Sequence, residues 1–186
     1  MSFTLTPTMG QERRHPHVVN LEEVDANEMK QGDFVHKSRR LGTAAGGCAL
    51  GCSYYELPPE KTTFPFHFHS AKEEAIYVLE GEGTLRIGKD EVAIKKGDYV
   101  ALLPGPDHAH ALSNRGTGPL RYLCMSGSAT PVTREIVGYP DSKKIAMYAG
   151  ADPSKGASRD NGWMFKILKD DRPDAGYFDD EPLASK

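Results

Sequence analysis

Residues 67–81, HFHSAKEEAIYVLEG, decide the fold and the chemistry that we expect of this chain of 186 residues. Side chains alternate between the two faces of a strand, so His67 and His69 should point the same way and Phe68 the opposite way. Glu74 follows in the same predicted hairpin and can add a carboxylate oxygen. Because neutral imidazole and carboxylate together suit Zn, Fe, Mn, Ni and Cu, the stretch predicts a metal site.

A second histidine pair, His108-Ala109-His110, lies in residues 97–114, GDYVALLPGPDHAHALSN. One imidazole from this pair would complete three nitrogen ligands and one oxygen ligand while leaving coordination positions free. Open positions distinguish a catalytic metal from a structural one. We therefore expect one divalent metal ion per chain. The pair at His15 and His17 has no carboxylate at matching spacing, so we assign it no metal.

These two stretches resemble the motifs of the cupin superfamily. The first motif has the form His-x-His, three or four residues, Glu, six residues and Gly, and it is matched by His67, His69, Glu74 and Gly81. The second runs from a Gly through a Pro and a Gly to a His and, three residues later, an Asn, and it is matched from Gly97 through Pro104 and Gly105 to Asn114. The resemblance covers roughly residues 50–125.

Two departures from the family pattern affect the ligand assignment. Glu60 and Lys61 stand where the first motif usually opens with Gly, and about two extra residues surround Pro106 and Asp107 in the second motif. Because of this insertion, the fourth ligand of the resemblance falls on either of two histidines.

Counting forward from Gly105 selects His108, whereas counting back from Asn114 selects His110. We prefer His110, because residues 110–114 are typical of a strand and residues 104–108 of a turn that absorbs an insertion. His108 has the same parity as His110, so we predict that it is catalytic, as a base beside the metal. An exposed loop imidazole is its alternative interpretation. The predicted metal ligands are His67, His69, Glu74 and His110.

The resemblance implies an all-β fold, a double-stranded β-helix or jelly-roll barrel, and the strand pattern agrees with it. Short apolar stretches broken by Gly and Pro predict strands at residues 50–57, 65–69, 75–80, 83–87, 92–95, 99–103, 110–114 and 120–126. We divide the chain into an N-terminal extension, a cupin barrel core and a C-terminal extension that packs on the barrel or on a partner subunit, residues 1–47, 48–127 and 128–186. Residues 17–21 predict one further strand, and residues 22–31 form a charged stretch.

Strand parity predicts which side chains face the barrel interior. If Glu74 points inward, Ile76 and Val78 do so too, and Tyr77 faces outward with Leu79. The apolar outer residues are Phe66, Phe68, Tyr77 and Leu79. Such a surface predicts either cover by the terminal segments or a contact between subunits, and we expect a homodimer.

Composition limits the partners. The net charge of −3 and pI near 6.2 provide no field that attracts phosphates, so we expect no nucleic-acid partner. We expect no membrane partner and a cytoplasmic location, because no apolar run has the length of a membrane span or of a signal peptide. The three cysteines, an odd number, indicate reduced thiols.

Two functions of different class follow. In the first, the protein is a metal-dependent enzyme of the cupin type, an isomerase or a dioxygenase acting on a small oxygenated substrate such as a sugar or a carboxylate. In the second, it is a non-catalytic sensor or binding module in which the metal anchors a small ligand. An acid or base with a shifted pKa beside the metal would favour the enzyme.

Overall fold

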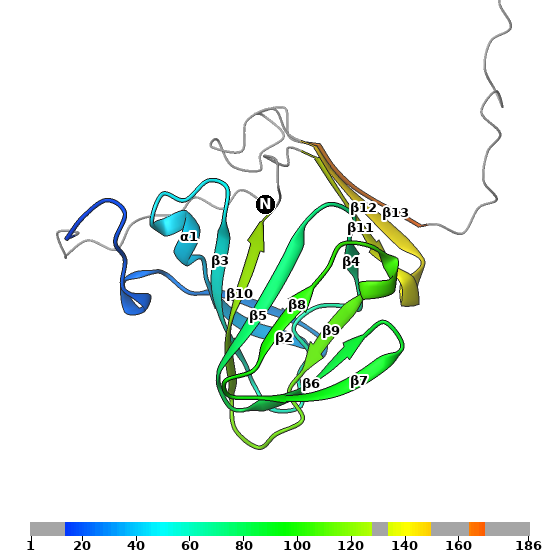
Figure 1. The fold of residues 1–186 in the computed structure, drawn as a ribbon, viewed down its shortest axis with the longest axis horizontal. Helices are drawn as coiled ribbons and strands as arrows, with labels where there is room; N and C mark the ends of the chain where they lie inside the picture. Colours follow the sequence, from blue (N-terminus) through cyan, green and yellow to red (C-terminus); the bar gives the residue numbers. More distant parts are fainter. Residues whose placement is uncertain (1–13, 128–133, 150–163, 170–186) are drawn as a thin grey trace, which may run out of the picture.

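The computed structural model describes residues 14–127, 134–149 and 164–169, and strands dominate these residues (Figure 1). All strand pairs between named strands are antiparallel, as in a jelly roll built from hairpins and longer returns. The all-β jelly-roll fold that the sequence predicts is confirmed.

The largest sheet has six strands within the described residues. In sheet order it consists of β1 (Asn27–Gln31), β2 (Phe34–Arg39), β3 (Gly51–Leu57), β10 (Leu120–Gly127), β5 (Glu73–Glu80) and β8 (Tyr99–Leu102). Strands β1 and β2 form a hairpin that places part of the predicted N-terminal extension in this sheet.

Two smaller sheets lie opposite, next to each other (Figure 1). One has three strands, in the order β7 (Asp90–Lys95), β6 (Glu82–Ile87) and β9 (His110–Ser113). The other has four described strands, in the order β13 (Met164–Lys169), β12 (Lys144–Ala149), β11 (Arg134–Tyr139) and β4 (Phe68–His69). Residues beyond 127 therefore add strands directly to the fold.

Helical segments are short in the described residues. They are the 3₁₀ turns η1 (Leu21–Glu23), η2 (Pro106–His108) and η3 (Pro140–Ser142) and the helix α1 (Leu41–Ala44). The strand predicted at residues 17–21 is wrong, because Asn20 caps η1 there. Its side chain accepts a hydrogen bond from the Glu22 backbone N–H, and the Glu23 carboxylate accepts one from the Asn20 backbone N–H.

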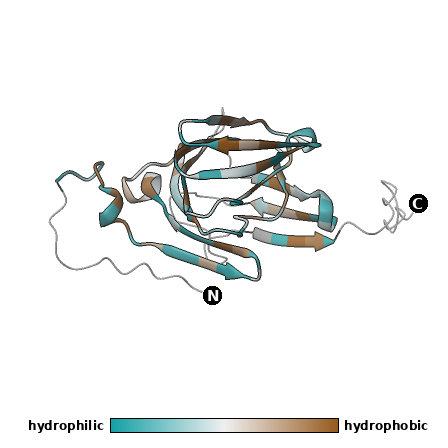
Figure 2. Cartoon of the chain, turned by 90° about the horizontal axis from the view of Figure 1, so that it is seen from below, coloured by the Kyte–Doolittle hydropathy of each residue, from teal (hydrophilic) through white to brown (hydrophobic). Residues whose placement is uncertain are grey.

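The hydrophobic core lies between the sheets. Its buried members are Leu57, Ile76, Val78, Leu85, Ile94, Leu102, Leu112, Leu120 and Tyr122. Hydrophobic and hydrophilic residues are mixed along the strands, as expected of strands with one buried face (Figure 2). On β5 the predicted parity is confirmed, because Ile76 and Val78 are buried and Tyr77 is 40% exposed.

The segment after residue 133 covers part of the predicted outer apolar surface. Strand β11 pairs with β4, and the bare backbone of Gly138 accommodates the ring of Phe68, which would clash with a Cβ atom there. Phe66 is buried beneath the guanidinium of Arg86, whose carbon lies 3.6 Å from the ring centroid. Arg86 also donates two hydrogen bonds to Asp141 at 2.6 and 3.0 Å, which ties η3 to β6.

Two residues of the family motifs have structural roles. Gly81 has a φ of +82°, and a Cβ atom there would lie 2.5 Å from the Pro119 carbonyl oxygen, so only glycine fits without a shift. Asn114 is fully buried and donates hydrogen bonds to the carbonyls of Leu57 and Gly118, at 2.8 and 2.9 Å. Its side-chain oxygen accepts the Gly116 backbone N–H, so this side chain joins β9 to the chain ahead of β10.

In the part of the chain that the structure describes, no helix is long and apolar enough to span a membrane. The three cysteines are free thiols, as predicted.

Candidate metal centre

The backbone brings the two histidine pairs together. His67 and His110 form an antiparallel bridge in which each backbone N–H donates to the carbonyl of the other, at 3.1 and 2.7 Å. His69 lies two residues along, in β4, and Glu74 extends from β5 of the large sheet. The first motif thus contributes His67, His69 and Glu74 to this site, and the second motif contributes His110.

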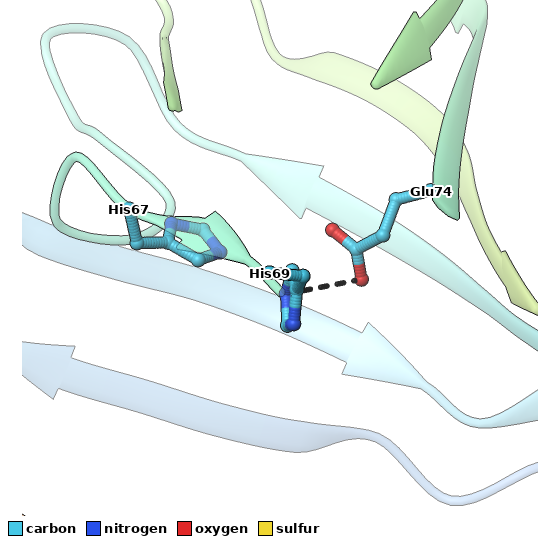
Figure 3. A group of neighbouring side chains, drawn as sticks. All are labelled: His67, His69 and Glu74. Atoms are coloured by element: carbon cyan, nitrogen blue, oxygen red, sulfur yellow. Dashed lines mark ion pairs between the residues drawn. The ribbon is translucent and has the colours of Figure 1, made fainter. Parts of the chain in front are cut away.

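Three of the predicted ligands form a compact group. Atoms of His67, His69 and Glu74 that could bind a metal all lie within 4.8 Å of one another (Figure 3). His69 Nε2 lies 3.6 Å from Glu74 Oε1, the contact drawn as a dashed line in Figure 3. His110 is not part of this group of three, but it contacts the second oxygen of Glu74, with Nε2 3.5 Å from Oε2. Two atoms that each lie roughly 2.1 Å from one ion are at most about 4.2 Å apart, so each of these two contacts is short enough for a pair of ligands to one ion.

The imidazoles are oriented for coordination through Nε2. His67 Nδ1 faces the Pro65 carbonyl oxygen at 2.8 Å, and His110 Nδ1 faces the His108 carbonyl oxygen at 3.1 Å. A backbone carbonyl only accepts, so Nδ1 carries the hydrogen in both rings and the Nε2 lone pair is free. Such a bond to the far nitrogen is typical of metal-ligating histidine.

Burial prepares His67 and His69 for a metal by keeping these two imidazoles neutral. It lowers the pKa of His67 to about 4, helped by the neighbouring His110. Burial also lowers the pKa of His69, against the opposing effect of the Glu74 carboxylate. For Glu74, burial raises the pKa, but the nearby imidazoles, His110 foremost, bring it below its ordinary value. Neutral nitrogens beside a carboxylate are the protonation states that metal binding requires.

A cavity of about 250 Å³ lies over these residues. Most of its lining is aromatic or aliphatic, with a few hydroxyl groups and the predicted ligands. The lining consists of Tyr55, Thr63, Phe64, His67, His69, Glu74, Ile76, Leu102, His110, Ala111, Leu112, Tyr122, Cys124, Val137, Tyr139 and Tyr148. An apolar cavity with a small number of convergent polar groups is typical of a small-molecule site.

The phenols of the cavity were not identified from the sequence. Tyr122 and Thr63 share a hydrogen bond of 2.8 Å between their hydroxyls, and Tyr55 stacks on Tyr122. Tyr139 stacks on His67 with 6.1 Å between ring centroids and shares a hydrogen bond with Tyr148. Burial raises the pKa of Tyr139 and raises that of Tyr148 to about 12. These phenols therefore stay protonated at neutral pH.

His108, the predicted catalytic base, is not among the described residues that line this cavity. It is the last residue of the turn η2, and this turn lies where an insertion was expected, between Pro104 and His110. Its backbone carbonyl accepts from His110 Nδ1. The connection between His108 and the site is thus through its main chain.

A second recess, of about 450 Å³, lies over β2, β3 and β10. Its cations are already paired with acidic groups. Arg121 contacts Glu56 at 2.8 Å and Glu80 at 2.7 Å, and Lys37 contacts Glu28 at 3.0 Å. Because these charges are neutralised, the recess gives no reason to expect an anionic ligand, and the histidine cavity is the stronger candidate.

Comparison with known proteins agrees with the fold. Residues 53–126 match the family described as Cupin domain. Over 60 residues the chain is 37% identical to an uncharacterized protein, MJ1618, of Methanocaldococcus jannaschii, a match that covers 32% of this chain and 46% of that protein. The chain thus spans about half the length of this relative. Over 114 residues, 61% of this chain and 73% of the relative, it is 25% identical to the tetracenomycin polyketide synthase protein TcmJ of Streptomyces glaucescens.

Solved structures share the fold over most of the chain. A sugar phosphate isomerase of the cupin superfamily from Silicibacter pomeroyi is 20% identical and has a TM-score of 0.68. The match covers 86% of this chain and 97% of that one. A protein from Acidithiobacillus ferrooxidans, named as a putative sugar phosphate isomerase, is 24% identical and has a TM-score of 0.67. The match covers 83% of this chain and 92% of that one. Residues 53–126 thus match the Cupin domain family, and the solved structures share the jelly-roll fold of the chain.

Proposed function

We propose that the protein is a metal-dependent enzyme that acts on a small oxygenated molecule, such as a sugar or a carboxylate, as an isomerase or an oxygenase. One observation carries the proposal. The imidazoles of His67 and His69 lie together with the Glu74 carboxylate at the wall of a largely apolar cavity, and His110, in the same wall, contacts that carboxylate. This donor set would hold one divalent ion, of Zn, Fe, Mn, Ni or Cu.

The ion would supply Lewis-acid polarisation of a substrate oxygen. The protein's own groups would orient the substrate and handle its protons. Tyr139 and Tyr148, which share a hydrogen bond, can donate to a substrate oxygen, and the Thr63 and Tyr122 hydroxyls offer a second polar point. Apolar side chains such as Ile76 and Leu112 exclude water from the remaining surface.

The lining also supports a choice of substrate class. Among the described residues around the cavity, none is Lys or Arg. A phosphate in this cavity would thus have no cationic side chain from these residues to pair with. The proposal therefore favours unphosphorylated sugars over sugar phosphates, and a small carboxylate would depend on the metal ion for its positive partner.

Turnover by the metal-loaded protein tests this proposal. The assay follows oxygen uptake with small carboxylates and isomerisation of sugars by proton NMR. Wild-type protein should turn over at least one of these substrates, whereas His69→Ala should not. His15→Ala is the matched control, because His15 is exposed and distant in sequence from the motifs. A metal-loaded wild-type protein that turns over none of them contradicts an enzyme of this class.

A non-catalytic, metal-anchored binding module is the second candidate. Burial raises the pKa of three side chains that line the cavity, Tyr55, Tyr122 and Cys124. None of them is therefore a base at neutral pH, and the lack of a base among them favours binding without catalysis. Calorimetric titration separates the candidates. A ligand that binds only the metal-loaded protein and is recovered unchanged supports the binding module.

We also propose that the protein is a homodimer. Tyr77 and Tyr99 lie opposite each other on neighbouring strands of the large sheet and are 40% and 62% exposed. Exposed apolar side chains that lie together mark contact surfaces. Sedimentation equilibrium should give about twice the chain mass of 20.4 kDa, and a Tyr77→Ser, Tyr99→Ser variant should give the single mass. A wild-type monomer contradicts this proposal.

A further inference from the structure

Glu135 is a buried carboxylate that the function proposed above does not use. It lies on β11, outside the segment that matches the family, and is 5% exposed. The pairing of β11 with β4 sets Val137 opposite His69, so Glu135 is held beside the end of β4. A carboxylate this buried needs partners that compensate for lost hydration.

One oxygen of Glu135 is held firmly. Oε1 accepts hydrogen bonds from the Ser70 backbone N–H at 2.8 Å, the Ser70 hydroxyl at 3.1 Å and the Ala71 backbone N–H at 3.2 Å. These donors follow His69 directly in the chain. The carboxylate is therefore fixed to the same short segment that carries a predicted metal ligand.

Two neighbouring polar atoms are left without a hydrogen bond in the described structure. Glu135 Oε2 and His69 Nδ1 are both buried and have no partner. His69 Nδ1 lies 3.9 Å from Glu135 Oε1, so a small rotation of the ring or the carboxylate would join the two groups. Buried polar atoms without partners are uncommon, and here a donor and an acceptor are adjacent.

His69 differs in this respect from the two other histidines. His67 and His110 each direct Nδ1 to the backbone carbonyl two residues earlier. For His69 the corresponding carbonyl belongs to His67, and it already accepts the His110 backbone N–H at 2.7 Å. A ring that coordinates through Nε2 must carry its hydrogen on Nδ1 and needs an acceptor there, and Glu135 is the adjacent one.

We propose that Glu135 is a positioning residue, which accepts the Nδ1 hydrogen of His69 and so fixes this ring with Nε2 facing the metal. The inference rests on the proposed metal centre. Its carboxylate also makes the imidazole a stronger ligand. A strand outside the matched family segment would thus control the affinity of the centre.

The test compares Co²⁺ binding by wild-type protein and Glu135→Gln. Glutamine keeps the size of the side chain, and its oxygen can still accept from Ser70 and Ala71, but its amide presents donors where His69 Nδ1 needs an acceptor. We expect the dissociation constant, measured by chelator competition, to rise roughly 10- to 100-fold. The visible absorption of bound Co²⁺ should shift, and the melting temperature of the metal-free protein should change little.

A double-mutant cycle with His69→Ala separates positioning from a structural role. If Glu135 acts through His69, Glu135→Gln has no further effect on Co²⁺ affinity once His69 is alanine. An equal loss in both backgrounds overturns the inference, as does an unchanged affinity in the single variant. Wild-type protein that binds no Co²⁺ instead overturns the proposed metal centre itself.

If Glu135→Gln does not fold, the zinc-loaded wild-type protein can be used to test whether Glu135 accepts the Nδ1 hydrogen of His69. Long-range proton–nitrogen NMR of the His69 ring should show a slowly exchanging Nδ1 proton, shifted downfield by the carboxylate. An Nδ1 that carries no such proton overturns the inference.

Discussion

His67 and His110 face each other across a single antiparallel bridge, with both backbone hydrogen bonds formed and 4.6 Å between the ring centroids. These residues come from the two histidine pairs, forty-three positions apart in the sequence. The bridge fixes the register of the two segments, so it sets which member of the second pair lies beside His67. Within a strand, a shift of one residue would turn the ligand away.

This register predicts opposite effects on metal binding for the two members of the second pair, His108 and His110. His110→Ala should weaken metal binding by at least roughly tenfold, because it removes a nitrogen that lies 3.5 Å from Glu74 Oε2. His108→Ala is the matched control and should keep the metal, because it retains the carbonyl that orients His110. Titration of both variants with Zn²⁺ measures the difference. Loss of binding in His108→Ala, with retention in His110→Ala, would assign the ligand to the other histidine.

Glu74→Gln should weaken metal retention more than it destabilises the protein. The change removes one negative charge between His69 and His110 and almost no volume. Glu73→Gln, an exposed change on the same strand, is the control and should bind metal as wild type does. Metal affinity and the melting temperature of the metal-free protein are compared. A large fall in melting temperature with unchanged affinity would make Glu74 a structural residue.

Acid should remove the metal. Protons compete with the ion for the imidazoles, and since burial lowers the pKa of His67 to about 4, retention should persist below the ordinary histidine pKa of about 6.5 and fail towards pH 4. Metal content after dialysis at a series of pH values measures this. Undiminished retention at about pH 4 is incompatible with an imidazole-rich centre.

The same lowered pKa predicts how the stability of the metal-free protein depends on pH. Between about pH 6.5 and 4 the unfolded chain binds a proton at His67 that the folded chain does not. The contribution of neutral His67 to the free energy of unfolding is therefore fully present above this window. It is lost as the pH falls through the window. Chemical unfolding of wild type and His67→Gln measures the slope, which should be smaller in the variant. Equal slopes would show that His67 does not contribute.

Asn114→Ala should reduce the free energy of unfolding by at least about 2 kcal/mol, because it leaves the buried carbonyl of Leu57 and two further backbone groups without their partner. Asn27→Ala, on the exposed strand β1, serves as the control. Urea unfolding of the two variants gives the comparison. Equal stability would mean that the Asn114 side chain contributes nothing beyond its volume.

The sequence predicted the strands from β3 to β10 well, because each has either apolar alternation or Gly and Pro at its ends, except that the strand predicted at residues 65–69 forms only at Phe68–His69. It did not predict the hairpin of β1 and β2. All five residues of β1 are exposed, so this strand has no buried face and no alternation to detect. Its pairing with β2 depends on the register from Asn27 opposite Ser38 to Gln31 opposite Phe34, which a pattern of apolar residues does not encode.

The candidate site also contains residues that the sequence predicted and one that it did not. His67, His69 and Glu74 have a local spacing that strand geometry turns into convergence, so the sequence sufficed to propose them. Glu135 could not be found this way, since it reaches Ser70 across 65 positions and belongs to no motif. Its role depends on the pairing of β11 with β4, which only the tertiary structure reveals.

Elemental analysis of the protein purified from its own host tests the metal centre most directly. Three imidazoles and one carboxylate predict about one divalent metal ion per chain. The content should fall in His69→Ala and be restored in wild-type protein by soaking after chelation. Wild-type protein with well under one ion per chain, and no increase on soaking with Zn²⁺, Fe²⁺, Mn²⁺, Ni²⁺ or Cu²⁺, would contradict the assignment.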